Sequence, residues 1–228
     1  MDLKSIQKPY DVVIGLGGNC QVAYQLKRLG LRTFATPVDQ MLLDEVKMIN
    51  KAIYNDFRGY ASFRNIKLRL DLTESNSANY VVHNPLYDWY SHHDYSKKYP
   101  RWLWFLQHPK IQKRFNRRIR NFCRHIEEAN SILFVRADDV DRSEDLKELS
   151  RMLRKKLKGS FNILAIKYGT KYGEIDIDDD FVCYMEIPHH VINDPWQGKN
   201  QVWDEMMNGI RLNSESCNSN EKHYQTVP

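Results

Sequence analysis

One stretch of the sequence, residues 131–169, constrains the fold more than any other. It opens with the apolar run "SILFVRADD", continues with a charged segment whose leucines recur at helical spacing, and closes with the apolar run "FNILAIKYG". Two buried strands joined by a helix form a crossover unit, which makes the strands parallel neighbours in one sheet. Parallel sheets are covered by helices on both faces. The sequence therefore predicts a three-layer α/β fold with a mainly parallel central sheet flanked by helices.

Three other segments extend this prediction. Residues 12–16 form a short apolar run before a glycine-rich loop, which is typical of another buried strand. Residues 108–128 predict a long helix, because apolar residues recur along one face of it. Residues 78–95 are rich in aromatic and β-branched residues on both sides of the Asn84-Pro85 turn. They predict an antiparallel hairpin inserted into the α/β domain.

The length of 228 residues is ordinary for one domain. We expect a single α/β domain over residues 1–212 and a disordered tail over residues 213–228, because the tail is polar and poor in apolar residues. No apolar run approaches the roughly 18 residues of a membrane helix. The N-terminal "MDLKSIQKPY" also lacks the apolar centre of a signal peptide. A cytoplasmic protein without a membrane partner is therefore expected.

The cysteines and the charges exclude several classes of site. The four cysteines are widely spaced with no CxxC pair, so neither a disulfide framework nor a zinc site is indicated. We expect no metal and no other cofactor. The formal net charge is +5, and six cations fall on one face of the helix predicted at 108–128. Such faces are usually solvated or paired with carboxylates, so nucleic acid is not the expected partner.

The segment "GLGGNC", residues 15–20, joins the first predicted strand to a helix. A cysteine at a helix N-terminus is next to unpaired main-chain amides and the positive end of the helix dipole, which lower the pKa of a thiol. Cys20 is therefore a candidate nucleophile. The amides around Gly17, Gly18 and Asn19 are candidates to bind the oxyanion that forms when a thiolate attacks a carbonyl.

Two alternatives for this loop stay open from the residues alone. Glycines between a strand and a helix can hold the phosphates of a nucleotide, and Asp39 lies where an acidic ribose ligand is expected. In this alternative the protein is a non-catalytic or nucleotide-binding α/β module, although Cys20 replaces the third glycine of the G-x-G-x-x-G fingerprint. The other alternative is a small buried cysteine that packs a tight turn.

Three segments resemble one known family. "LGGNCQVAYQLKRLGLRTFATPVDQM", "SHHDY" and "ILFVRADD" are similar to sequences of an uncharacterised, mainly bacterial family described as putative papain-like cysteine peptidases, over about residues 10–170. The resemblance implies a cysteine nucleophile followed along the chain by a histidine and an acid. Residue by residue, the motifs of the family fall on Asn19 and Cys20, on Pro37 and Asp39, and on His93, Asp94 and Tyr95.

A thiol nucleophile needs a base within hydrogen-bond reach and an acceptor that orients the base. His93 is the predicted base, whereas His92 points to the opposite face of an extended segment. Asp39 is the predicted orienting acid, because Asp94 is adjacent to His93 and neighbouring strand side chains diverge. The expected function is thiol-dependent hydrolysis or acyl transfer on a small-molecule or peptide substrate that the sequence does not identify.

Two further groups of residues are secondary candidates. His189 and His190, followed by Asp194, form a rival base beyond the last predicted strand, where active-site groups of open α/β sheets gather. Arg136 ends the strand "ILFVR", and its guanidinium is a candidate to bind a carboxylate or a phosphate. An ion pair of Arg136 with one of the two aspartates that follow it is the alternative.

Overall fold

The central sheet follows the predicted parallel pattern. The computed structural model describes residues 1–39, 41–43, 45–189 and 194–213. Five strands lie in the order β2-β7-β8-β10-β9, and all neighbouring pairs are parallel except β10 with β9. The strands are β2 (Val12–Gly15), β7 (Ser131–Asp138), β8 (Ser160–Gly169), β9 (Gly173–Ile175) and β10 (Val182–Pro188). The strand–helix–strand unit predicted at residues 131–169 is therefore present.

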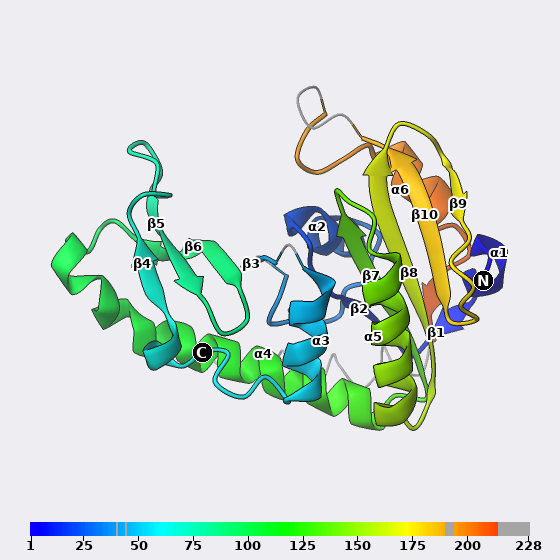
Figure 1. The fold of residues 1–228 in the computed structure, drawn as a ribbon, viewed down its shortest axis with the longest axis horizontal. Helices are drawn as coiled ribbons and strands as arrows, with labels where there is room; N and C mark the ends of the chain where they lie inside the picture. Colours follow the sequence, from blue (N-terminus) through cyan, green and yellow to red (C-terminus); the bar gives the residue numbers. More distant parts are fainter. Residues whose placement is uncertain (40, 44, 190–193, 214–228) are drawn as a thin grey trace.

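Helices cover both faces of this sheet (Figure 1). Consecutive residues of β2 enter two different apolar clusters, Val12 and Ile14 on one face and Val13 on the other. The first cluster includes residues of α3 (Val46–Tyr54), α4 (His108–Glu128) and α5 (Ser143–Lys156). The second includes residues of α1 (Leu3–Ile6), α2 (Cys20–Arg28) and α6 (Asn200–Met206). The predicted three-layer α/β fold is confirmed.

The predicted hairpin is present, but it belongs to a second sheet. β5 (Asn79–Asn84) and β6 (Trp89–Ser96) are antiparallel, and β4 (Lys67–Arg69) and β3 (Met41–Leu42) extend the sheet at its two edges. Short 3₁₀ helices, η1 (Phe63–Asn65) and η2 (Arg101–Gln107), flank it in the chain. The long helix α4 runs along both sheets (Figure 1). One apolar cluster includes Trp89 of β6, Phe115 of α4 and Phe134 of β7, so the two sheets share a core.

The two ends of the described chain meet beside the central sheet. β1 (Pro9–Tyr10) pairs in parallel with β11 (Arg211–Leu212), and the Asn213 side chain donates a hydrogen bond of 2.6 Å to Asp11. The tail predicted from residue 213 therefore has its first residue attached to the fold, while residues 214–228 lie outside the described residues. Among the residues described, no helix has both the length and the apolar character needed to cross a bilayer.

Candidate functional site

A pocket of about 700 Å³ lies at the N-terminal end of α2, where parallel strands β7 and β10 end. One wall is a single face of α2, because the lining residues Cys20, Ala23, Tyr24 and Lys27 follow the spacing i, i+3, i+4, i+7. The other walls come from several elements, namely Leu42 of β3, His93 of β6, and the chain just after β7 and β10. A crevice beyond the carboxyl ends of parallel strands is the usual place for a ligand site in such sheets.

The glycines before Cys20 bring the chain close to the central sheet. Gly17 and Gly18 have positive φ angles of 76° and 93°. A Cβ atom on Gly18 would lie 1.8 Å from the carbonyl oxygen of Ala137 in β7, which no side chain tolerates. The loop can therefore reach its position only with glycine at residue 18. Both glycines serve the geometry of the turn that leads into α2.

Asn19 caps α2. Its side-chain oxygen accepts a hydrogen bond of 3.0 Å from the main-chain N–H of Gln21. The first N–H groups of a helix have no partner within the helix. Among the described residues the main-chain N–H of Cys20 makes no hydrogen bond, so a ligand oxygen can use it.

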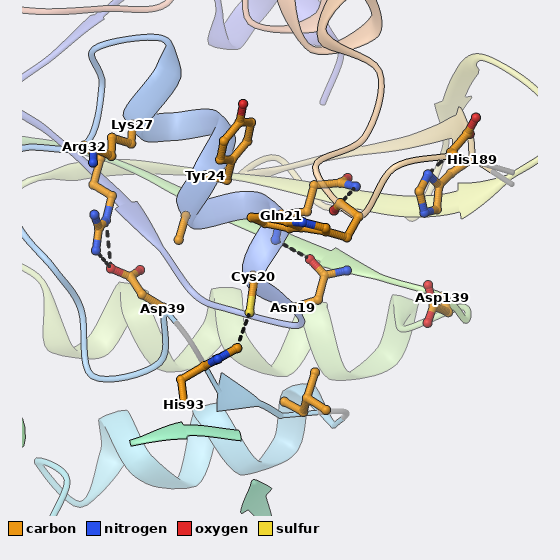
Figure 2. Close-up of a pocket in the computed structure, with 14 residues that line it drawn as sticks. Asn19, Cys20, Gln21, Tyr24, Lys27, Arg32, Asp39, His93, Asp139 and His189 are labelled. Carbon is orange, nitrogen blue, oxygen red and sulfur yellow. Dashed lines mark hydrogen bonds and ion pairs between the residues drawn. The ribbon is translucent and has the colours of Figure 1, made fainter. Parts of the chain in front are cut away.

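Cys20 and His93 lie next to each other in the pocket (Figure 2). The distance from Cys20 Sγ to His93 Nε2 is 4.0 Å, within reach of a hydrogen bond that involves sulfur. Cys20 is half-buried at the start of α2, and His93 is exposed on β6. His92 is not among the residues that line this pocket. The structure thus places next to each other the two residues that the sequence analysis predicts as nucleophile and base.

The environment of Cys20 acts against the thiolate that its helix position predicts. Burial, and to a smaller degree the negative charge of Asp39, raise the pKa of the Cys20 thiol above its ordinary value. The expectation of a lowered pKa took account of the helix terminus alone. With a raised pKa, Cys20 keeps its proton near neutral pH, and a nucleophilic attack has to deliver that proton to a base.

This shift gives a testable pH dependence. Alkylation by a small neutral reagent follows the fraction of thiolate, so the rate at Cys20 should keep rising with pH through a midpoint above about 8.5, the value of a free thiol. The measurement is the rate of iodoacetamide modification of the Cys20 peptide, followed by mass spectrometry between pH 6 and pH 11. A rate that is already constant from pH 7 upward would mean a preformed thiolate and would contradict the shift.

Asp39 has other partners than the predicted one. Its buried carboxylate accepts hydrogen bonds from Arg32 Nε at 2.8 Å, from the main-chain N–H of Thr36 at 2.9 Å and from Thr36 Oγ1 at 2.8 Å. Arg32 Nη2 bonds the same carboxylate oxygen, Oδ2, as Arg32 Nε, and Arg32 lies only seven residues away in the chain. Among the described residues, His93 Nδ1 has no hydrogen-bond acceptor. The prediction that Asp39 orients His93 does not match this arrangement, nor is Asp39 free for a ribose.

Arg136 is a structural residue. Its side chain is fully buried, and it donates hydrogen bonds of 2.8 Å and 2.6 Å to the Asp138 carboxylate. It also donates to the carbonyl oxygens of Leu16 and Leu43, at 3.0 Å and 2.8 Å. The prediction that Arg136 binds an external anion is therefore wrong for this structure. The guanidinium instead ties the loop after β2 and the segment after β3 to the end of β7.

The rival base also lines the pocket, at some distance from Cys20 in the close-up view (Figure 2). His189 Nδ1 lies 3.5 Å from Asp194 Oδ2, and the His189 ring packs against Tyr168 with centroids 4.7 Å apart. His190 lies outside the described residues. Of the histidines that the structure describes, His93 and His189 line the pocket, and His93 is the one in reach of the thiol.

Several pocket residues were missed from the sequence, among them Tyr24, Lys27 and Trp196. Tyr24 and Lys27 follow Cys20 by four and seven residues on α2, and this helical spacing was a signal that could have found them. Trp196 packs edge-on against Tyr24 with ring centroids 5.3 Å apart. It comes from a distant segment, and no local pattern indicates it. Within the described ranges, no three His, Cys, Asp or Glu side chains are grouped so as to hold a metal ion.

Comparison with known proteins agrees with the motifs. Residues 11–169 match the family described as "Putative papain-like cysteine peptidase". "Uncharacterized protein R408" of Acanthamoeba polyphaga mimivirus is 29% identical over 85 residues, which cover 32% of this chain and 38% of that protein. The match thus spans well under half of the length of this relative, which is viral rather than bacterial. No solved structure matches the chain. Because the family match covers most of the chain and includes both Cys20 and His93, the chain belongs to the family described as putative papain-like cysteine peptidases.

Proposed function

We propose that the protein is a cysteine-nucleophile hydrolase or acyl transferase that acts on an amide or ester carbonyl bound in the pocket at α2. The observation that carries this proposal is the 4.0 Å separation of Cys20 Sγ and His93 Nε2 in the lining of a pocket of about 700 Å³. A pocket of this volume is in the usual range for a small substrate. The family to which the chain belongs supports the same class of chemistry.

The raised pKa of Cys20 sets the order of the steps. His93 Nε2 accepts the thiol proton while Cys20 Sγ forms a bond to the carbonyl carbon, and the carbonyl oxygen takes up the negative charge. The main-chain N–H of Cys20, at the positive end of α2, stabilises that oxygen. His93 then gives the proton to the departing amine or alcohol, which leaves a thioester on Cys20. Water releases the acyl group in hydrolysis, and a second nucleophile releases it in transfer.

Replacement of Cys20 by serine tests this proposal. With p-nitrophenyl acetate the wild-type protein should release a burst of about one p-nitrophenolate per chain and carry an acetyl group on the Cys20 peptide. The burst of the Cys20→Ser variant should be slower by at least about 100-fold, because a serine hydroxyl is a far weaker nucleophile than a thiol beside a base.

Cys183→Ser is the matched control. Cys183 is fully buried in β10, and burial raises its pKa to about 12, so its removal should leave the burst unchanged. A Cys20→Ser variant that still acetylates at the wild-type rate would overturn the proposed nucleophile.

A further inference from the structure

Charge is distributed unevenly along the pocket of Cys20. Lys27 and Arg32 lie at one end of it, and Asp139 lies at the other end with His189, while Cys20 and His93 lie between them (Figure 2). A substrate that reaches across the pocket therefore meets cations on one side of the reacting carbonyl and an acidic group on the other.

Lys27 presents an available cation. Its side chain is exposed, and among the described residues it makes no ion pair or hydrogen bond. It lies seven residues after Cys20 on α2, so two helical turns place both on the same face, about 10 Å apart along the axis. Lys27 therefore belongs to the lining of the pocket that contains Cys20, two helical turns further along α2.

Arg32 is held in place at the same end. Its Nε and Nη2 atoms donate to Asp39, and Thr36 fixes the carboxylate in turn. A guanidinium has five N–H donors, so this pairing leaves Nη1 for another acceptor. The side chain keeps 22% of its surface exposed in the pocket lining. Arg32 therefore offers an anion a donor whose position is already fixed.

Two further arginines near Arg32 add positive charge at this end. Arg118 on α4 interacts electrostatically with Asp39 and Arg32, and its Nε and Nη1 are buried without a hydrogen-bond partner. Arg114 bonds Asp94 in the same region. Among the described residues, these three arginines interact with two carboxylates, Asp39 and Asp94. Lys27 adds a further cation to the lining, so the named groups at this end carry more positive than negative charge.

We propose that the end of the pocket formed by Lys27 and Arg32 binds a carboxylate of the substrate, roughly 10 Å from the carbonyl that Cys20 attacks. This inference rests on the proposed function. The preferred substrates are acyl or peptide compounds that carry a carboxylate about three extended residues from the scissile bond, since extended chain spans about 3.3–3.6 Å per residue. The acidic side chain of Asp139 disfavours the reverse orientation.

Three alkylating reagents that differ only in terminal charge test this. Each is an iodoacetamide with a five-methylene chain on its nitrogen, and the chain ends in a carboxylate, a carboxamide or an ammonium group. When extended, this chain places the end group roughly 10 Å from the reacting carbon, the span of two helical turns. The rate at Cys20 should be about fivefold to tenfold higher for the carboxylate than for the carboxamide, and lowest for the ammonium. Added salt should weaken the preference.

Lys27→Gln should remove most of the preference for the carboxylate, measured as the ratio of the carboxylate rate to the carboxamide rate within the same variant. Lys155→Gln, on the exposed surface of α5, makes the same change in net charge away from the pocket and should keep the preference. Equal rates for carboxylate and carboxamide, unaffected by Lys27→Gln, would overturn the carboxylate site while Cys20 remains a nucleophile. Failure of all three reagents and of p-nitrophenyl acetate at Cys20 would instead overturn the proposed function, and this inference with it.

Discussion

Replacing His93 with alanine should slow the acetylation of Cys20 by about 100-fold or more, the usual contribution of a positioned general base. The raised pKa keeps the Cys20 thiol protonated, and the substitution removes the proton acceptor, which lies 4.0 Å from the sulfur. The measurement is the burst rate with p-nitrophenyl acetate at neutral pH, together with the melting temperature of each variant. His92→Ala is the matched control, since His92 is adjacent in the chain and does not line the pocket.

The rival base gives this experiment a second arm. His189 lines the same pocket and has a carboxylate partner in Asp194. If His93→Ala keeps the wild-type burst rate while His189→Ala loses it, the base lies beyond β10 and the pairing of Cys20 with His93 has no role in the reaction.

Replacing Arg136 with methionine should lower the free energy of unfolding by about 3–5 kcal/mol, the cost of breaking a buried ion pair by removing one partner. Burial raises the pKa of Asp138 even with Arg136 beside it, so the carboxylate without its partner is strongly disfavoured. The carbonyl oxygens of Leu16 and Leu43 also lose a donor. Urea unfolding followed by circular dichroism measures the change.

Two variants make the test of Arg136 specific. Arg69→Met removes an exposed ion pair with Asp71 and should cost less than about 1 kcal/mol. The double variant Arg136→Met with Asp138→Leu removes both charges, so it should be more stable than Arg136→Met alone. A loss below about 1 kcal/mol for Arg136→Met would contradict the structural role assigned to this side chain.

The elements that the sequence predicted well are those with strong local patterns. The helix predicted at residues 108–128 has these bounds in the structure, because a two-sided pattern over six turns leaves little freedom. β3 and β4 were not predicted. They are two and three residues long, too short to show a period, and they exist because distant residues such as Met41 and Ser91 pair.

The candidate site was predicted only in part, because some of its features are local in the sequence and others depend on distant segments. The position of Cys20 at a helix start is a local property, and the motif around His93 supplied its partner. Arg32 and His93 were both possible hydrogen-bond partners of Asp39, and the sequence does not show that the carboxylate bonds Arg32. The raised pKa of Cys20 depends on burial by walls from several separate elements, which a local pattern does not contain.

Cys20 and His93 come from different sheets, since α2 follows β2 of the central sheet and His93 lies on β6 of the second sheet. The two residues are 73 positions apart in the chain. The pair can therefore form only once the two sheets have docked on each other, and contacts distant in sequence are slow to form. The first appearance of the acetylation burst during refolding would time this docking separately from the formation of helices and strands.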